Sequence, residues 1–438
     1  METAAVSIVK KLQKAGHEAF FAGGCVRDRL RGAIPNDIDI ATSARPQEIL
    51  QLYPHGNTIG AHFGVILIKQ DGHLFEIATF REDGDYEDGR RPESVTFSTA
   101  KCDASRRDFT INGIFFDPLS EKLIDYVSGE QDLKSQLIRS IGTPSERFGE
   151  DYLRLLRAIR FATSLEFEIE AETWEAIKTG AENISKITPE RIQEELDKIW
   201  RSPHRVRGFD LLVESGLMKA ILPEIIELQG CEQPPQWHPE GDVFVHTRLM
   251  LKLLPADASL ELVMSVLFHD IGKPSTFTQD DADGRIRFNG HDKLGAQMAE
   301  GILNRLRYSN AITDAVVSGV ANHMAFKDVQ QMRTSKLKRF MAKEHFAMEL
   351  ELHRTDCAGS NGILENYHFL KEKEQEFAKE PLIPPPLITG KHLIDRGLKP
   401  GPDFKILLTR AQDLQLEGTL KSESEALEWL EGELSSPQ

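Results

Sequence analysis

The sequence predicts an α+β protein, with a mixed α/β head followed by an all-helical remainder. Short apolar runs separated by turns, which are typical of strands, are confined to residues 1 to about 140. From about residue 141 onward the apolar residues recur almost wholly with helical spacing. Glycine and proline in this second part stand mainly at element ends, as in ITPERI and ILPEI. Sheet and helices are therefore expected in separate parts of the chain.

The composition is that of a folded protein with several domains. The chain has 438 residues, of which 40% are hydrophobic and 28% charged, and this length favours two to four domains. The apolar runs are too short for a membrane span, and the N-terminal segment lacks the pattern of a secretory signal. The four cysteines show no metal-type pairing and suit a reducing compartment. We expect a cytoplasmic protein with no membrane partner.

The net charge is −16. Bulk binding of phosphate chains requires a positive surface, so the charge opposes a protein that coats nucleic acid. The charge does not exclude an enzyme that binds one RNA end through a local basic strip.

Composition shifts divide the chain into four predicted domains. A stretch rich in proline and glutamine, CEQPPQWHPEG at 231–241, is interpreted as a linker, and KEPLIPPPLITG at 379–390 marks another break. The predicted domains are a head, a helical neck and body that binds RNA, a histidine-rich helical domain, and a helical tail. Their expected ranges are 1–140, 141–230, 231–378 and 379–438.

Five runs in the head are expected to be strands or to contain them. They are AFFAGG, NDIDIAT, FGVILIK, HLFEIATF and ESVTFS. The first leads through Gly23 and Gly24 into a helix that is expected to begin near Cys25. Glycine there lets backbone amides approach a phosphate closely, and Arg27 adds a cation one turn into the helix. Taken alone, this motif is equally typical of an ordinary strand-to-helix turn.

NDIDIAT carries a carboxylate pair. Asp37 and Asp39 are two residues apart in an expected apolar strand, so both side chains should project from one face. Adjacent carboxylates repel unless a cation lies between them. Such a pair holds the Mg²⁺ ions that activate an attacking hydroxyl and neutralise a leaving pyrophosphate. Glu76, in the expected strand FEIATF, is a third candidate acid.

Two further motifs concentrate cations. Arg106, Arg107 and Asp108 precede FTIN, which is interpreted as strand-like, and this cluster suits the phosphates and ribose of a nucleotide. EDYLRLLRAIRF is interpreted as one helix. Its Arg154, Arg157 and Arg160 fall on one arc with Asp151 at the border, one turn from Arg154. Asp151 and Arg154 can then present an acceptor and a donor to the edge of a base, and Arg157 and Arg160 can meet phosphates.

These motifs resemble a known family. GGCVRDRLRGAIPNDIDIAT, FREDGDYEDGRRPESVTF, SRRDFTINGIFFDP and GEDYLRLLRAIRFA follow one another in the order and spacing of class II tRNA nucleotidyltransferases and bacterial poly(A) polymerases, within the polymerase β superfamily. The resemblance covers residues 20 to about 165. It implies a polymerase β-like head with Mg²⁺ held by Asp37 and Asp39 and with Glu76 as a further catalytic acid.

The resemblance also implies how nucleotides are bound and chosen. Asp151 and Arg154 act as a protein template that reads the incoming CTP or ATP. The nucleotide-binding residues that the motifs supply are Gly23, Gly24, Arg27, Arg106, Arg107, Asp108, Asp151, Arg154, Arg157 and Arg160. The mobile loop that switches the site from C to A carries Asp85, Asp88, Arg90 and Arg91.

The histidine-rich part resembles HD-type phosphohydrolases. Its motifs are VFVHTRL, LFHDIGKP, FNGHDKLGA, ANHM and HRTDCAGSNG. The resemblance implies four metal ligands, His246, His269, Asp270 and Asp356, and places His291 and His323 at a possible second metal. Imidazoles with carboxylates suit Mn²⁺, Ni²⁺ or a similar ion. The alternative that this domain retains the HD fold but has lost the hydrolytic activity stays open.

The predicted function is template-independent addition of CCA to the tRNA 3′ end from CTP and ATP, with release of pyrophosphate and no DNA partner. TIGAHFGVILI resembles tRNA enzymes more than poly(A) polymerases, and DGDYEDGRRP opposes CC-only addition. Three alternatives stay open: an A-adding enzyme, a poly(A) polymerase, and an HD-domain metal-dependent phosphohydrolase as the main or a second activity. A non-catalytic RNA-binding protein is opposed by the charge and the intact carboxylates. The sequence does not indicate an oligomeric state.

Overall fold

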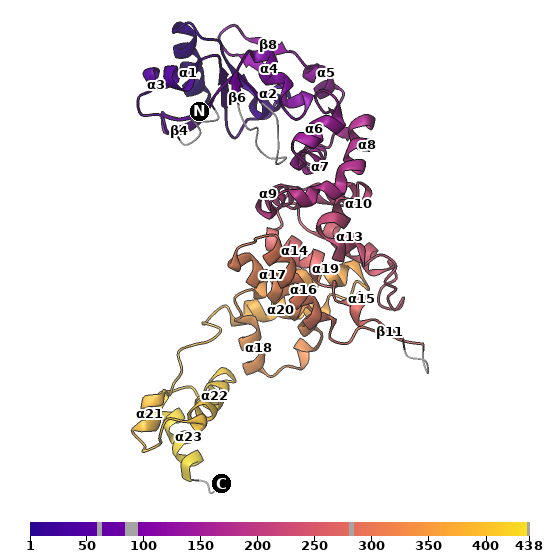
Figure 1. Ribbon diagram of the computed structural model, residues 1–438. Helices are drawn as coiled ribbons and strands as arrows, with labels where there is room; N and C mark the ends of the chain where they lie inside the picture. Colours follow the sequence, from indigo (N-terminus) through magenta and orange to yellow (C-terminus); the bar gives the residue numbers. More distant parts are fainter. Residues whose placement is uncertain (59–63, 84–94, 280–283, 436–438) are drawn as a thin grey trace. The chain divides into compact units, whose positions relative to one another are not determined.

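The computed structural model describes residues 1–58, 64–83, 95–279 and 284–435 (Figure 1). The chain forms two compact units, Met1–Ile226 and Glu227–Gln438. Each unit has buried apolar clusters of its own. Within the described part, no helix combines the length and the apolar character that a membrane crossing needs. The further division of each unit into two domains remains a prediction.

The first unit contains a mixed six-stranded sheet, as the sequence predicts. The strands run in the order β3-β4-β2-β1-β7-β8. Only β2 and β4 pair in parallel, and the other neighbours are antiparallel. The strands are β1 (Ala19–Ala22), β2 (Asp39–Thr42), β3 (Val65–Gln70), β4 (His73–Thr79), β7 (Ile114–Asp117) and β8 (Lys122–Asp125). A separate ribbon pairs β5 (Arg81–Asp83) with β6 (Val95–Phe97).

Both faces of the sheet are buried at its central strands β2, β1 and β7. Successive strand side chains point to opposite faces, so Phe21 joins one apolar cluster and Phe20 the other. The first cluster includes the apolar stripe of α1 (Glu2–Lys14), with Ile8 and Leu12 fully buried. This double cover explains why the central strands are apolar runs, whereas β3 and β4 alternate between buried and more exposed residues.

Helices complete the first unit. They are α2 (Gly24–Leu30), α3 (Pro46–Leu52), α4 (Ala100–Ser105), η2 (Thr110–Asn112), α5 (Gly129–Lys134), α6 (Pro144–Glu150), α7 (Leu153–Leu165), α8 (Ala171–Gly180), η3 (Ala181–Lys186), α9 (Pro189–Trp200), α10 (Arg205–Glu214), α11 (Leu217–Ile221) and α12 (Pro223–Ile226). β9 (Leu137–Ile138) and β10 (Glu168–Ile169) form a short parallel pair. The long α7 packs against α9 and α10, with Leu155, Leu156 and Ile159 fully buried. Its predicted arginines lie beside this packed face, and two of them, Arg157 and Arg160, contact Glu195 of α9.

The second unit is helical apart from the hairpin of β11 (Thr278–Gln279) and β12 (Ile286–Arg287). Its helices are α13 (Val243–Leu253), α14 (Leu260–Phe268), α15 (Lys273–Thr276), α16 (His291–Arg305), α17 (Asn310–Asn322), η4 (His323–Gln331), α18 (Thr334–Met341), α19 (Phe346–Gly359), α20 (Glu365–Phe377), α21 (Gly390–Ile394), α22 (Pro402–Leu416) and α23 (Glu423–Ser435).

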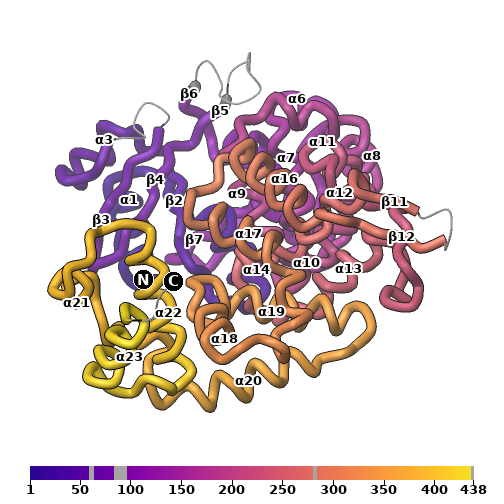
Figure 2. Tube along the Cα trace, turned by 90° about the horizontal axis from the view of Figure 1, so that it is seen from below, coloured from indigo at the N-terminus to yellow at the C-terminus, as the bar shows by residue number. Residues whose placement is uncertain are grey.

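The apolar α14 is the centre of this unit. It packs against α13, α16, α17 and α19 (Figures 1 and 2). Gly319 allows α17 to approach closely, because a Cβ there would meet the Ser265 side chain at 2.7 Å. α14 ends next to His269, so the HD dipeptide lies where these helices converge.

Candidate catalytic and metal centres

A polar cavity of about 520 Å³ in the first unit gathers most of the predicted head residues. They come from the turn after β1, the start of β2, the segment after α4, and α7. The predicted residues that line it are Gly23, Gly24, Arg27, Asp37, Asp39, Arg106, Arg107, Asp108, Asp151, Arg154, Arg157 and Arg160. Asn112, Phe161 and Arg191 also line it, and the sequence analysis did not single them out.

The carboxylates meet at the junction of β2 and β4. Asp39 begins β2, whereas Asp37 precedes the strand, so the expectation that both lie within it is wrong. Pairing with β1 ends at Ala22 and Asp39, which leaves Asp37 outside the ladder. Parallel pairing sets Ile40 opposite Ile77, and this register brings Glu76 beside Asp39.

This arrangement concentrates negative charge. The pKa of Asp39 is raised to about 6, mainly by burial and then by the charges of Asp37 and Glu76, against the opposing effect of Arg107. A divalent cation would offset both the burial and the repulsion. The oxygen donors are those that Mg²⁺ prefers, so the residues fit a Mg²⁺ site.

Glycine is required at position 23. Its φ is +74°, in the left-handed region, and a Cβ would meet Nη1 of Arg107 at 3.0 Å. As predicted, β1 leads through this turn into α2. Arg27 on α2 donates to Oδ1 of Asn112 at 2.8 Å and pairs with Asp28. Its guanidinium is thereby fixed at the wall of the cavity.

Arg106 and Arg107 share one buried partner. Asp103 on α4 lies 2.7 Å from Arg106 and 3.1 Å from Arg107. Burial acts to raise the pKa of Asp103, but the charges of Arg107 and Arg106 outweigh it and lower the pKa. Asp103 was missed by the sequence analysis, although its spacing of three and four residues from the arginines was a usable signal.

The expectation of a strand at FTIN is wrong, because the segment forms the 3₁₀ turn η2. The reason lies in Asp108, whose Oδ1 accepts hydrogen bonds from the backbone N–H of Phe109 at 2.8 Å and from Asn112 Nδ2 at 3.0 Å. These local bonds close the chain into a turn. Its other oxygen accepts from Nε of Arg157 at 2.8 Å. Burial acts to raise the pKa of Asp108, yet Arg157 and these hydrogen bonds hold it well below its usual range.

The arginine ridge of α7 consists of Arg154, Arg157 and Arg160, which line the cavity together as predicted. Each of the three is ion-paired. Arg154 contacts Glu150 at 2.6 Å, and Arg160 contacts the buried Glu195 of α9 at 2.6 Å. Arg157 pairs with Asp108, as described. No role could be predicted for Glu150 or Glu195 from the sequence, because an acid on a helix becomes significant only once its partner is known.

The expectation of one continuous helix through EDYLRLLRAIRF is wrong. α6 ends at Glu150, Asp151 is extended, and α7 begins at Leu153. Asp151 interrupts the helix because its Oδ1 accepts the N–H of Leu153 at 3.0 Å. The same carboxylate pairs with Arg191 of α9 at 2.6 Å. Asp151 and Arg154 still line one cavity, but from a break and a helix rather than from one helical turn.

The loop residues Asp85, Asp88, Arg90 and Arg91 lie outside the described residues.

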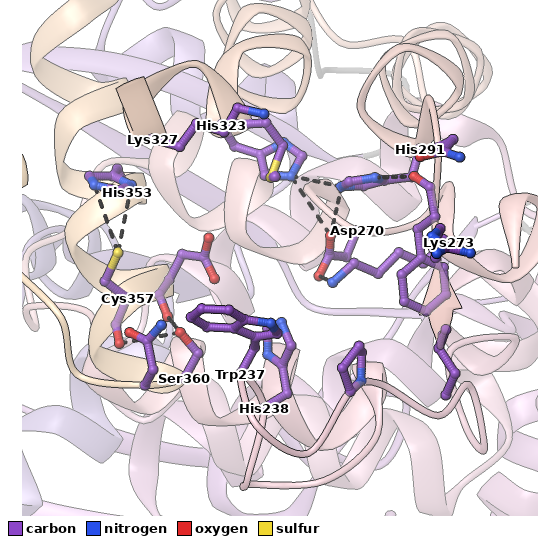
Figure 3. Close-up of a pocket in the computed structure, with 18 residues that line it drawn as sticks. Trp237, His238, Asp270, Lys273, His291, His323, Lys327, His353, Cys357 and Ser360 are labelled. Carbon is purple, nitrogen blue, oxygen red and sulfur yellow. Dashed lines mark hydrogen bonds and ion pairs between the residues drawn. The ribbon is translucent and has the colours of Figure 1, made fainter. Parts of the chain in front are cut away.

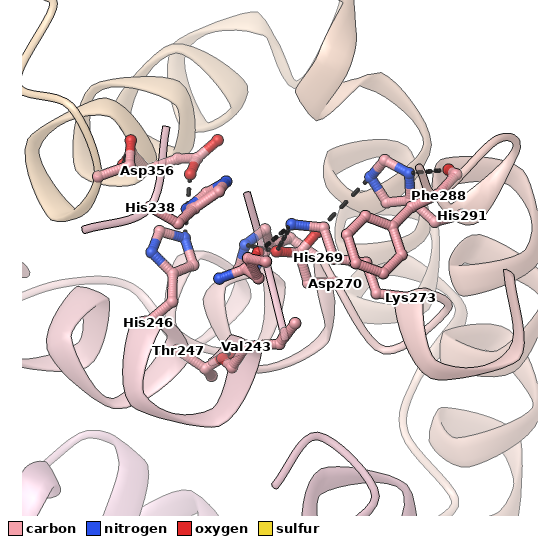
Figure 4. Close-up of polar contacts among 12 residues, drawn as sticks. His238, Val243, His246, Thr247, His269, Asp270, Lys273, Phe288, His291 and Asp356 are labelled. Carbon is pink, nitrogen blue, oxygen red and sulfur yellow. Dashed lines mark hydrogen bonds and ion pairs between the residues drawn. The ribbon is translucent and has the colours of Figure 1, made fainter. Parts of the chain in front are cut away.

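The second unit brings together the predicted histidines and aspartates in two adjoining groups (Figure 4). One group consists of His246, His269 and Asp356, and the other of Asp270, His291 and His323. Within each, the candidate ligand atoms lie within 4.8 Å of one another.

Asp270 lies between the two groups. Its Oδ2 is 3.0 Å from Nε2 of His269, and its Oδ1 is 3.5 Å from Nε2 of His291 and 3.8 Å from that of His323. Asp270 was predicted to bind the first metal together with His269. The geometry also places it in the second group, with His291 and His323.

Three of the imidazoles are oriented in the same way. Nδ1 of His269, His291 and His323 lies 2.7–2.9 Å from the carbonyl oxygen three residues earlier in the chain. A proton on Nδ1 then donates to the carbonyl and leaves the Nε2 lone pair facing the group. Burial lowers the pKa of His323 to about 4, which keeps that ring neutral.

These atoms fit a metal. Nε2 of His291 lies 3.1 Å from Nε2 of His323, where two lone pairs repel unless a cation or a proton lies between them. Among the described residues, the buried Nε2 of His269 and Oδ1 of Asp270 have no hydrogen-bond partner. Imidazoles with carboxylates suit a transition metal.

A cavity of about 590 Å³ opens onto this cluster (Figure 3). Trp237 and His238 lie on one wall, and Lys273 lies beside Asp270. Lys273 Nζ is 2.7 Å from Asp270 and donates to Oε1 of the buried Gln233 at 2.6 Å. The interpretation of 231–241 as a mere linker is therefore wrong, because its side chains bind to and line the candidate metal centre.

Comparison with known proteins gives three family matches along the chain. Residues 19–139 match the poly A polymerase head domain, and residues 166–228 match a probable RNA and SrmB-binding site of polymerase A. Residues 243–352 match the HD domain. The matches follow the order that the sequence predicts.

Curated relatives and solved structures point the same way. A CCA-adding enzyme of Geobacillus thermodenitrificans is 41% identical over 224 residues, which are 51% of this chain and 55% of that protein. The chain thus aligns with only about half the length of this relative. A CCA-adding enzyme of Lactobacillus helveticus is 29% identical over 437 residues, with 97% of this chain and 95% of the relative covered. The Bacillus stearothermophilus CCA-adding enzyme in complex with CTP has a TM-score of 0.76 at 25% identity, covering 99% of this chain and 97% of that one.

Proposed function

We propose that this chain, which belongs to the family of class II tRNA nucleotidyltransferases and bacterial poly(A) polymerases, adds CCA to the 3′ end of tRNA. CTP and ATP are the substrates and pyrophosphate is the product. The observation that carries the proposal is the cavity of the first unit, where paired carboxylates face a group of arginines. The relatives and the structural neighbour are CCA-adding enzymes, and the neighbour binds CTP.

The carboxylates would bind the metal ions at the point of reaction. Asp37 and Asp39, with Glu76 beside them, would hold Mg²⁺, which lowers the pKa of the tRNA 3′-hydroxyl and neutralises the charge on pyrophosphate as it leaves. Gly23 and Gly24 leave room for the triphosphate next to the backbone. Arg27, Arg106 and Arg107 bind its phosphates from the wall of the cavity.

The base is selected by the protein. Asp151 offers carboxylate oxygens and Arg154 offers N–H donors from one cavity wall. Asp108, paired with Arg157, supports the ridge that presents them and contacts the ribose. Arg160 supports it through Glu195. Because ion pairs fix these side chains, their donors and acceptors are pre-organised for a base.

The test is nucleotide addition to three tRNAs that lack CCA, lack only the terminal A, or are complete. CTP and ATP are supplied separately and together. We expect two Cs from CTP alone, and CCA from both nucleotides. Extension of only the CC-ended tRNA would identify an A-adding enzyme. A long A tail would identify a poly(A) polymerase.

The loop with Asp85, Asp88, Arg90 and Arg91 is proposed to switch the site from C to A. Asp151 and Arg154 must read two different base edges, which requires some such change. A variant shortened over 84–91 should add both Cs at a near wild-type rate and lose the terminal A. Loss of both activities would contradict the switch.

We further propose a metal-dependent phosphohydrolase as a second activity, in the second unit. The observation that favours it is the buried cluster at the base of a cavity that also presents Lys273. His246, His269, Asp270 and Asp356 would hold Mn²⁺ or Ni²⁺, with His291 and His323 at a second ion. The metal supplies a hydroxide at neutral pH. Release of inorganic phosphate from p-nitrophenyl phosphate, lost in His269→Ala, tests it.

The proposed site of action is the cytoplasm, where tRNA, CTP and ATP occur together. The four cysteines are all unpaired, which agrees with a reducing compartment.

A further inference from the structure

One imidazole of the metal cluster differs from the others in what faces its Nδ1. His269, His291 and His323 each have a backbone carbonyl there. The Nδ1 of His246 instead faces a carboxylate, with Oε1 of Glu240 at 2.7 Å in an ion-pair contact that lacks the alignment of a hydrogen bond. Its Nε2 lies 3.1 Å from Oδ1 of Asp356, on the side of the cluster (Figure 4).

Glu240 belongs to the segment before α13 that the sequence analysis treats as a linker. Its side chain is 9% exposed, and His246 is fully buried. Oε1 also lies 2.9 Å from Nδ1 of His238. Oε2 is buried and has no hydrogen-bond partner among the described residues. A carboxylate in such surroundings costs free energy to bury, so its place beside two imidazoles calls for a role.

We propose that Glu240 is a positioning residue, which orients His246 so that its Nε2 binds the metal. The carboxylate favours the proton on Nδ1, and the Nε2 lone pair is then free and directed toward Asp356 and His269. Carboxylates beside a ligating imidazole act in this way in metal sites, and their removal typically weakens metal binding by about 10- to 100-fold. The inference rests on the metal centre proposed above.

A different role for Glu240 is that of a ligand. His238, Glu240 and His246 also lie close enough together to hold an ion of their own. An ion there would occupy Nδ1 of His246, while Nε2 would bind the ion of the neighbouring group. Neutral imidazole has one lone pair, so it cannot serve both ions. The geometry therefore favours orientation over ligation.

The experiment is titration of the untagged full-length protein with Ni²⁺ alone, followed by calorimetry. The probe suits imidazole-containing sites, which separates the second unit from the oxygen-only site of the first. Four variants are compared with wild type: Glu240→Ala, Glu240→Gln, His238→Ala and Glu232→Gln. Glu232 is exposed in the same segment and makes a matched charge control.

We expect Glu240→Ala to raise the Kd for Ni²⁺ by about 10- to 100-fold at unchanged stoichiometry. Glu240→Gln should lose less, severalfold, because an amide oxygen can still face Nδ1 of His246 although the negative charge is gone. Glu232→Gln should bind as wild type, and His238→Ala should keep the wild-type stoichiometry. This graded rescue separates positioning from a general loss of structure, and the thermal midpoint without metal is measured alongside.

Wild-type affinity in both Glu240 variants would overturn the inference. Loss of one whole ion in Glu240→Ala and in His238→Ala would overturn it in favour of ligation. If Glu240→Ala does not fold, the Glu240→Gln variant decides between the same outcomes. A wild-type protein that binds no Ni²⁺, or as much as His269→Ala, would instead refute the proposed metal centre itself.

Discussion

The two candidate centres are built in opposite ways. In the first unit, charged side chains hold one another: Arg157 is held by Asp108 and Arg160 by Glu195. In the second, backbone carbonyls orient the imidazoles of His269, His291 and His323. A nucleotide site needs several donors and acceptors of fixed direction, and paired charges supply them. A metal site needs ligand lone pairs that converge on one point. Backbone carbonyls achieve this by fixing each imidazole so that its Nε2 faces the cluster.

Because the two centres are built differently, we expect that each can be inactivated without the other. The largest expected loss of activity follows a change at the carboxylates of the first unit. Asp39→Ala should reduce nucleotide addition by at least about 1000-fold, on the scale of losing a main electrostatic element of a transition state. The measurement is single-turnover addition of C to tRNA lacking CCA. Ni²⁺ binding by the second unit should be unchanged. Near wild-type addition would refute the metal role of Asp39.

The reciprocal change is His269→Ala. It removes a buried imidazole whose Nε2 faces the cluster, and we expect the Kd for Ni²⁺ to rise by at least about 100-fold, in line with losing a direct ligand rather than a supporting group. Elemental analysis after dialysis gives the metal content. Nucleotide addition should stay within about twofold of wild type. A shared loss of both activities would show that the two centres are coupled.

The buried pairs of the first unit should also be the more costly to break. Asp108→Asn removes the nearer charged partner of Arg157 and leaves Glu195 at 3.9 Å. The free energy of unfolding should fall by about 2 kcal/mol, the range for hydrogen bonds to a charged group. Glu130→Gln, which breaks the exposed pair with Lys134, should cost less than about 1 kcal/mol. Urea unfolding measures both. Equal losses would mean that the buried pair is not a support of the ridge.

How much of the fold and the sites could be predicted depends on how far apart in the sequence the interacting residues lie. Gly23 and the pair Asp37 and Asp39 are local patterns, and the structure brings them together in one cavity. Asp103 could have been assigned from its spacing of three and four residues to Arg106 and Arg107. Glu195 could not, because an acid distant in the sequence acquires a role only when folding brings its arginine to it.

The two wrong elements have a related cause. The helical spacing of apolar residues runs through Asp151 without a break, and FTIN has the composition of a strand. In both places an aspartate side chain captures a backbone N–H and redirects the chain. The segment 231–241 was misjudged for its composition, since proline-rich sequence is typical of linkers and here carries Gln233 and Glu240 to the metal cluster.

The smallest expected effect is on the choice of nucleotide. Asp151→Asn keeps an oxygen that can accept the N–H of Leu153, so the break before α7 should persist. It removes the charge that pairs with Arg191 and exchanges acceptor oxygens for an amide donor at the base. Discrimination between bases should fall by about 5- to 30-fold, or about 1–2 kcal/mol, the range expected for a changed polar contact.

The measurement is the ratio of kcat/KM for CTP to that for UTP on tRNA lacking CCA, and for ATP to that for GTP on CC-ended tRNA. Glu194→Gln, an exposed change of the same charge on α9, is the control and should leave both ratios unchanged. A lower rate with unchanged ratios would assign Asp151 to the support of Arg191 and α7. A changed ratio would show that the paired charges around Asp151 take part in telling one base from another.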